Sequence, residues 1–112
     1  MGILRRVTAT WTALADTHRR ALLELLLERP RPVGELVDRL GLTQPGTSKH
    51  LRVLRDAGLV TVRRDAQRRL YAVNPAPLAE AHGWLDQYRR LWDGRLDALE
   101  QHLDDTTNPE DR

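Results

Sequence analysis

The stretch Leu-Thr-Gln-Pro-Gly-Thr-Ser-Lys-His-Leu-Arg-Val-Leu-Arg-Asp-Ala-Gly-Leu-Val, residues 42–60, contains both ends of one helix and organises its neighbours. Thr43 is suited to the N-cap, and Pro45 fits the first turn, where a missing N–H costs nothing. Gly58 can adopt the left-handed conformation that ends a helix. We therefore expect a helix over about residues 44–57. Its buried face carries apolar residues at helical spacing, namely Leu51, Leu54 and Ala57.

The segment before this helix predicts a helix-turn-helix pair. Residues 32–40 form a short amphipathic helix, and Gly41 to Thr43 is a turn of the length that joins such pairs. In this motif the second helix reads DNA. Its first turns carry side chains that can bond base edges or phosphates, namely Gln44, Thr47, Ser48 and Lys49. The alternative for these four residues is an ordinary solvated helix face.

Length and composition limit the class of protein. A chain of 112 residues fits one domain with a modest core. It has no apolar run of about 18 residues and no hydrophobic signal segment, so we expect a cytoplasmic protein without a membrane partner. The absence of cysteine excludes disulfides, thiolate metal sites and thiol redox sensing.

Charge is distributed unevenly along the chain. Residues 1–74 carry a net charge of +7 and residues 75–112 a net charge of −5, which together give the overall +2. The basic part coincides with the helix-turn-helix pair and the segment after it, which favours a polyanion as partner. A GC-rich genome would account for part of the arginine count, but not for its distribution.

Two helices precede the pair. Residues 3–14 place Ile3, Leu4, Val7, Trp11 and Leu14 at spacings of three and four. This helix needs a partner to lie on, and the last helix is the obvious candidate. Asp16 or Thr17 then caps a second helix that runs to about Arg29. Its predicted buried side consists of Leu22, Leu23, Leu26 and Leu27.

After Gly58 the sequence predicts a β-hairpin. Val60 and Val62 begin one strand, residues 70–73 form the other, and the tip between them is strongly charged. Four arginines, Arg63, Arg64, Arg68 and Arg69, flank this tip. A wing laid along DNA explains that density. The alternative is a solvated tip that is basic for solubility.

The last predicted helix runs from Leu78 to about Leu103. At roughly 26 residues it would be about 39 Å long, more than so small a domain can cover. A second copy of the chain is the simplest partner for the remaining apolar stripe. The predicted dimer interface comprises Val7, Trp11, Leu85, Tyr88, Trp92, Leu96 and Leu99. We expect residues 1–103 to form the domain and residues 104–112 a flexible acidic tail.

The order of these elements resembles the winged helix-turn-helix repressors of the ArsR (arsenical resistance operon repressor) family. Residues 13–20 are similar to the family's "ALADPTRR", residues 33–36 to "VGEL", and residues 44–60 to "QPAVSKHLxxLxxAGLV". Segments 88–92 and 95–99 resemble the tail of a branch that does not sense metals. Gly46 departs from the family's usual alanine and Ala66 from its usual wing glycine.

The resemblance implies a mainly helical fold with a small β-hairpin and a homodimer paired through its first and last helices. It also implies binding to a roughly palindromic operator through the four helix residues and the four wing arginines named above. His50 is expected to be partly buried and structural. The family's metal ligands are absent, because residues 35–40 lack cysteine and residues 74–77 lack ligands.

Other functions find less support in the residues. His82, Asp86 and His102 do not converge within one helix, and His18 fits a cap region better than a metal site, so no metal or cofactor is expected. The alternative is that an antiparallel partner copy brings His82 and His102 together across the dimer. Ser48, His50 and Asp56 point in different directions on one short helix, which argues against a catalytic triad and an enzyme. A winged helix serving only as a protein interaction module is the serious alternative. The sequence does not identify the operator, the regulated genes or any effector.

Overall fold

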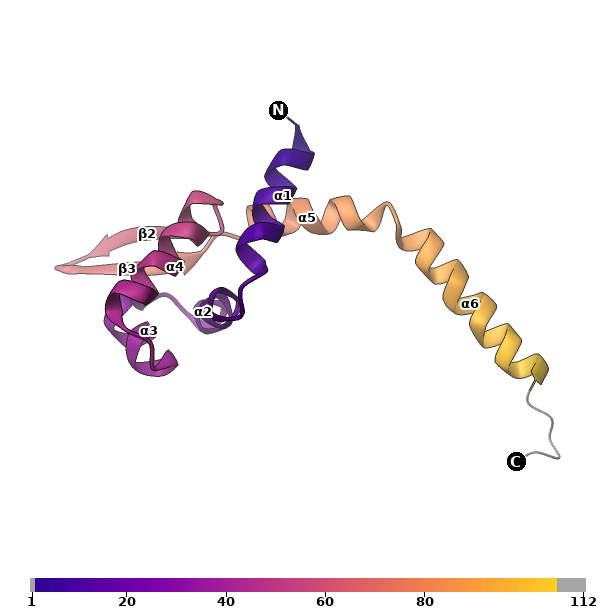
Figure 1. The fold of residues 1–112 in the computed structure, drawn as a ribbon. Helices are drawn as coiled ribbons and strands as arrows, with labels where there is room; N and C mark the ends of the chain where they lie inside the picture. The colour runs from indigo at the N-terminus through magenta and orange to yellow at the C-terminus, as the bar shows by residue number, and fades with distance from the viewer. Residues whose placement is uncertain (1, 107–112) are drawn as a thin grey trace. The chain divides into compact units, whose positions relative to one another are not determined.

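A computed structural model describes residues 2–106, with side chains as far as Leu103. The elements are α1 (Ile3–Leu14), α2 (Thr17–Glu28), β1 (Arg31–Pro32), α3 (Val33–Leu40), α4 (Gln44–Asp56), β2 (Val60–Asp65), β3 (Arg68–Val73), α5 (Ala76–Asp86) and α6 (Arg89–Thr106) (Figure 1). Two compact units, Met1–Ala81 and His82–Arg112, divide the chain within α5. The predicted fold class, a helical winged helix-turn-helix with a small antiparallel sheet, is confirmed.

Helix α4 has the ends that its sequence predicts. The Thr43 side chain accepts a hydrogen bond of 3.1 Å from the Gly46 amide and so satisfies one unpaired donor of the first turn. Gly58 follows the helix with a left-handed φ of 79°, and Gly41 ends α3 with a φ of 68°. A side chain at either position would be strained. The turn between α3 and α4 therefore depends on local sequence.

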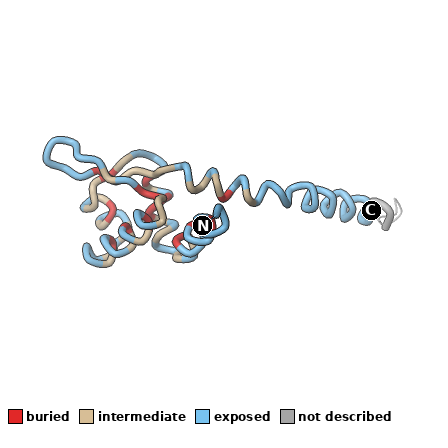
Figure 2. Tube along the Cα trace, turned by 90° about the horizontal axis from the view of Figure 1, so that it is seen from above, coloured by how far each residue is buried: buried red, intermediate tan, exposed pale blue. Residues whose placement is uncertain are grey.

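The core of the first unit lies where α2, α3 and α4 meet the start of β2 (Figure 2, red). It is built mainly from Leu22, Leu23, Leu26, Leu36, Leu51, Leu54, Leu59 and Val60. The prediction that Leu27 is buried is wrong, because 67% of its surface is exposed. At 3.6 residues per turn, Leu27 lies about a quarter of a turn from the centre of the stripe formed by the buried Leu22, Leu23 and Leu26.

The sequence reading missed β1. Arg31 is 97% buried and donates to the Leu25 carbonyl at 2.9 Å, while its other nitrogens form ion pairs with Glu28 and Glu35. These partners compensate the burial of its charge. The strand pairs with β3 through Arg31↔Tyr71 and Pro32↔Leu70, which gives the sheet order β1-β3-β2. The base of the hairpin is thereby joined to the segment between α2 and α3.

Two further ion pairs connect elements of the first unit. Arg6 of α1 binds Glu80 of α5 with a nitrogen–oxygen distance of 2.8 Å, which agrees with the expectation that the first helix lies on the last. The Arg6 guanidinium holds the pKa of Glu80 below its usual range. Arg29, which follows α2, likewise lowers the pKa of Glu35 on α3. Both carboxylates are therefore charged at neutral pH.

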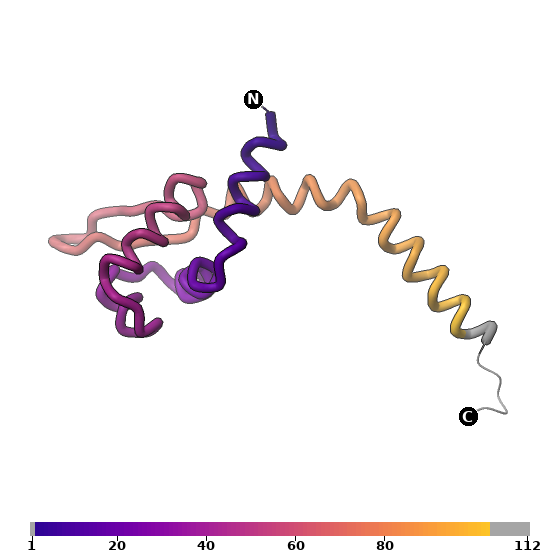
Figure 3. Tube along the Cα trace, in the orientation of Figure 1, coloured from indigo at the N-terminus to yellow at the C-terminus, as the bar shows by residue number. Residues whose placement is uncertain are grey.

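The prediction of one continuous last helix is wrong, because the chain turns at residues 87–88 between α5 and α6 (Figure 3). The Gln87 side chain donates to the Trp84 carbonyl at 2.8 Å, and the Tyr88 amide donates to the Leu85 carbonyl at 2.9 Å. In an uninterrupted helix these carbonyls would bond the amides of residues 88 and 89. The side-chain bond and the shorter-range bond thus replace the helical pattern.

Helix α6 is the last described element, and its backbone stays helical to Thr106. A flexible tail is predicted over residues 104–112, but residues 104–106 are helical. Residues 107–112 lie outside the described residues. Over residues 2–106, no helix combines the length and the apolar character that crossing a bilayer requires.

Candidate nucleic-acid interface

The first turns of α4 present three exposed polar side chains. Gln44, Ser48 and Lys49 are all exposed, and within residues 2–106 none of their side chains forms a hydrogen bond or ion pair. The amides at a helix N-terminus favour phosphate oxygens. This end of α4 therefore offers both donors for base edges and a positive dipole end for the backbone of DNA.

Thr47 does not belong to that surface, and the prediction that it contacts DNA is wrong. Its side chain is fully buried, and its hydroxyl donates to the Thr43 carbonyl at 2.9 Å. Thr47 lies one turn before Leu51 on the buried stripe of α4. A polar residue type had suggested an exposed position, but the helical period decides which way the residue faces.

The hairpin divides the four predicted wing arginines between its two faces. In the β2–β3 register Arg64 pairs with Arg69, whereas Arg63 pairs with the buried Leu70. Arg68 forms an ion pair with Asp65 at 3.4 Å. Because like charges directly opposite on a sheet are destabilising, the Arg64–Arg69 pair favours a polyanion partner that would offset the repulsion.

A cleft of about 430 Å³ separates the exposed side of α4 from β3. It is lined by Ser48, Leu51, Arg52, Arg55, Asp56, Arg69 and Tyr71. The sequence reading did not single out Arg52 and Arg55, although their spacing of three residues places them on one helix face. Three arginines around one cleft suit phosphate oxygens, which guanidinium groups bind in a two-pronged geometry.

The predicted dimer residues differ in their exposure. Val7 is 98% buried within its own chain, so its assignment to a dimer interface is wrong. Trp11 is exposed, as are the predicted residues of the second unit, Leu85, Tyr88, Trp92, Leu96 and Leu99. In Figure 2 the trace of α6 has the colour of exposed residues up to the part drawn in grey. Leu91 and Leu103 enlarge this apolar surface.

Comparison with known proteins defines the class. Residues 16–62 match the family model described as bacterial regulatory protein, arsR family. The chain is 38% identical over 107 residues to the HTH-type transcriptional regulator Rv2034 of Mycobacterium tuberculosis, covering 95% of this chain and all of the relative. These matches, with the fold, define a DNA-binding winged-helix transcriptional regulator rather than an enzyme. The chain belongs to the ArsR family.

Other relatives differ in the direction of control. The chain is 42% identical over 80 residues to the transcriptional activator HlyU of Vibrio cholerae, covering 71% of each chain. It is 27% identical over 84 residues to the transcriptional repressor SdpR of Bacillus subtilis, covering 75% of this chain and 93% of the relative.

One solved structure is described as a homodimer. The homodimeric winged helix-turn-helix domain of Mb0332 from Mycobacterium bovis matches with a TM-score of 0.61 and 25% identity, covering 85% of each chain.

Proposed function

We propose that two copies of this chain bind a roughly palindromic DNA operator in the cytoplasm and repress transcription, including that of the chain's own gene. In each copy, Gln44, Ser48 and Lys49 approach base edges and nearby phosphates. The wing arginines and the α4–β3 cleft hold the DNA backbone. The protein needs no metal or other cofactor for this binding.

The observation that carries the proposal is the arginine-lined cleft along α4, from Ser48 to the end of the helix. Across the described part of the chain, the side chains of Arg52, Arg55 and Arg69 form neither an ion pair nor a hydrogen bond. Asp56 also lines the cleft but forms no ion pair with these arginines among the described residues, so three guanidinium groups outnumber one carboxylate there and favour an anion. An interaction module that binds protein would instead be expected to have an apolar or mixed-charge surface here.

The dimer is supported by the apolar surface of the second unit. Helix α6 has no buried residue among its described side chains, yet it carries Leu91, Trp92, Leu96, Leu99 and Leu103. Burying a leucine or a similar side chain contributes about 1.5–3 kcal/mol. Several such side chains on each copy can stabilise a symmetric interface, and the Mb0332 structure is homodimeric.

The first experiment measures fluorescence anisotropy of the protein on duplex DNA from upstream of its gene and on a shuffled duplex, over a range of salt. We expect tighter binding to the upstream duplex. Arg69→Ala should make the slope of log affinity against log salt shallower by about 0.9 for each phosphate that is no longer neutralised, so by about 1.8 for a dimer. Arg90→Ala removes the same charge from α6 and should leave the slope unchanged.

Equal binding to both duplexes, with no site recovered in a genome-wide selection, would favour the interaction module. An unchanged slope in Arg69→Ala would remove the cleft from the interface. A reporter fused to the upstream region tests the direction of control, because repression predicts higher expression when the gene is deleted. Lower expression would make the protein an activator.

The dimer has a matched test of its own. Leu99→Glu places a charge in the apolar stripe, whereas Gln101→Glu adds the same charge on another side of α6. We expect sedimentation equilibrium to give a monomer for Leu99→Glu and a dimer for Gln101→Glu. Operator affinity should fall only with the first substitution. A dimer that survives Leu99→Glu would place the interface elsewhere.

A further inference from the structure

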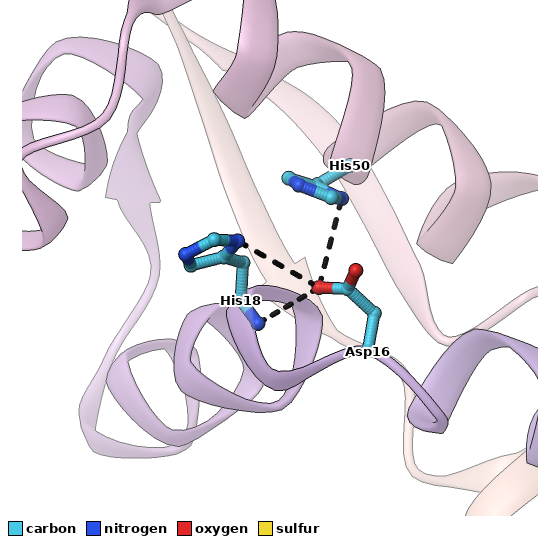
Figure 4. A group of neighbouring side chains, drawn as sticks. All are labelled: Asp16, His18 and His50. Carbon is cyan, nitrogen blue, oxygen red and sulfur yellow. Dashed lines mark hydrogen bonds and ion pairs between the residues drawn. The ribbon is translucent and has the colours of Figure 1, made fainter.

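Three potential metal ligands from two helices meet beside α4. Asp16 caps α2, His18 lies in its first turn, and His50 lies in the middle of α4 (Figure 4). The Oδ1 atom of Asp16 is 3.9 Å from Nδ1 of His18 and 4.0 Å from Nδ1 of His50. The three donor atoms all lie within 4.8 Å of one another. No other group of this kind converges within the described side chains.

The spacing is close to that of a metal site. Zinc binds imidazole nitrogen and carboxylate oxygen at about 2.0–2.2 Å, so two ligands at a tetrahedral angle are roughly 3.4 Å apart. The two distances from Oδ1 of Asp16 exceed this by about half an ångström, and the donor atoms of the two histidines lie within 4.8 Å of each other. The His18 side chain is 54% exposed and can rotate to close the gap. Its exposure also gives an ion a path from solvent.

The His50 imidazole has its Nδ1 on the cluster side. Nη1 of Arg19 is 3.4 Å from this nitrogen, and because a guanidinium only donates, the contact is a hydrogen bond in the tautomer that leaves Nδ1 unprotonated. In that tautomer the Nδ1 lone pair can bind an ion that takes the place of Arg19. Arg19 is held independently by bonds to the carbonyls of Ala13 at 2.6 Å and Thr12 at 3.1 Å. An ion can displace the contact to His50 without releasing Arg19 from these carbonyls.

Asp16 is also prepared as a ligand. Its Oδ1 accepts hydrogen bonds from the backbone amides of His18 at 2.8 Å and Arg19 at 3.2 Å, which fix the carboxylate. Metal ligands must be deprotonated, and outer hydrogen bonds orient them. The positive charge of Arg19 opposes a cation, so the affinity should be lower than in a closed structural site.

We propose that Asp16, His18 and His50 bind a divalent transition metal ion, Zn²⁺ in particular. Two imidazoles and a carboxylate are a donor set that zinc accepts when a fourth position remains open. The ion would link the start of α2 to α4, the helix that bears the proposed DNA-reading side chains. Metal binding itself does not depend on the proposed function, since it is measured without DNA.

For the test, the full chain is first stripped of metal with a chelator, which is then removed. The chain is titrated with ZnCl₂ in competition with a chromogenic chelator, and separately with CoCl₂, whose binding is followed by visible absorption. We expect one ion per chain, and a Co²⁺ spectrum of tetrahedral intensity. His18→Ala should weaken binding by at least the 10- to 100-fold typical of losing an outer-shell partner. His82→Ala and His102→Ala, which remove histidines outside the cluster, should bind like the parent protein.

His18→Ala is the informative variant because Asp16 bonds the His18 backbone amide, which the substitution keeps. The cap of α2 and the fold should therefore survive, as circular dichroism can verify. His50→Ala should give the same loss of metal. The proposal would be overturned if the parent chain bound no metal or if His18→Ala kept the parent's metal affinity. It would also be overturned if His82→Ala lost as much metal affinity as His18→Ala. DNA binding then reports separately on the proposed function.

Discussion

Gly46→Ala tests the start of α4 in quantitative terms. A Cβ at this position would lie 2.9 Å from Oγ1 of Thr43, the atom that accepts the hydrogen bond from the Gly46 amide. This is closer than a carbon and an oxygen normally approach. The alanine that is usual in related sequences can therefore enter this chain only if the Thr43 side chain moves and its cap bond is broken or weakened.

Two opposing effects of similar size decide the outcome. Alanine exceeds glycine in helix propensity by about 0.8–1.0 kcal/mol, and the loss of a threonine N-cap costs about 1 kcal/mol. We expect Gly46→Ala to change the free energy of unfolding by less than about 0.5 kcal/mol in the parent chain. In a Thr43→Ala background the cap is already gone, so the same substitution should stabilise by up to about 1 kcal/mol.

Urea denaturation of the four proteins of this double-mutant cycle measures the coupling between the two positions. All four must be compared at one protein concentration, since association contributes to the measured stability. A coupling energy near 1 kcal/mol is expected. If Gly46→Ala stabilises the parent chain by the full helix-propensity difference, the contact with Thr43 does not matter and the reasoning is refuted.

Further predictions concern the hairpin tip, acid stability and the buried hydroxyl. Ala66 has a φ of 57°, so Ala66→Gly should relieve left-handed strain and raise the free energy of unfolding by about 0.5–1 kcal/mol in urea denaturation; a loss of stability would contradict this. The carboxyl pKa values of Asp16, Glu35 and Glu80 are lower in the folded chain than in the unfolded one. Their contribution is therefore present above about pH 4 and lost as the pH falls through the folded pKa values. The melting temperature should stay level from pH 7 to 5 and fall below pH 5, and it should fall less steeply in Glu80→Gln than in the parent chain. Equal slopes in the two proteins would show that Glu80 does not contribute to the acid sensitivity. Thr47→Ser should cost about 1 kcal/mol of stability through its buried methyl group but leave the operator affinity of the folded protein unchanged, and a clear loss of affinity would return Thr47 to the interface.

Features fixed by neighbouring residues could be predicted from the sequence. The cap at Thr43 and the left-handed Gly58 are predicted correctly, and the cap of α2 is Asp16, one of the two residues predicted for it, because each depends on a hydrogen bond or a backbone conformation within a few residues. The period of three and four likewise gave the bounds of α1 as observed. In these segments local preference and tertiary packing agree.

The errors arose where a residue has two physically sensible positions. Thr47 is polar and yet buried, because its hydroxyl finds a carbonyl one turn away. Residues 85–88 continue the apolar period, but the bonds from the Gln87 side chain to the Trp84 carbonyl and from the Tyr88 amide to the Leu85 carbonyl replace the helical pattern there. The approach of His50 to Asp16 joins positions 34 residues apart and follows from the packing of α4 on α2. No local pattern predicts such a contact.

The exposed stripe of α6 has a consequence for the amount of protein in a cell. A chain that has not yet met a partner copy exposes Leu91, Trp92, Leu96 and Leu99 of α6 to solvent, and a helix that buries little of its apolar surface opens readily. Proteases cleave such open segments in proportion to how often they are populated. Newly made chains would survive when they meet another copy and be degraded when they are scarce. The lifetime of the protein would then rise with its abundance, and the regulator would have a threshold of synthesis below which it does not accumulate.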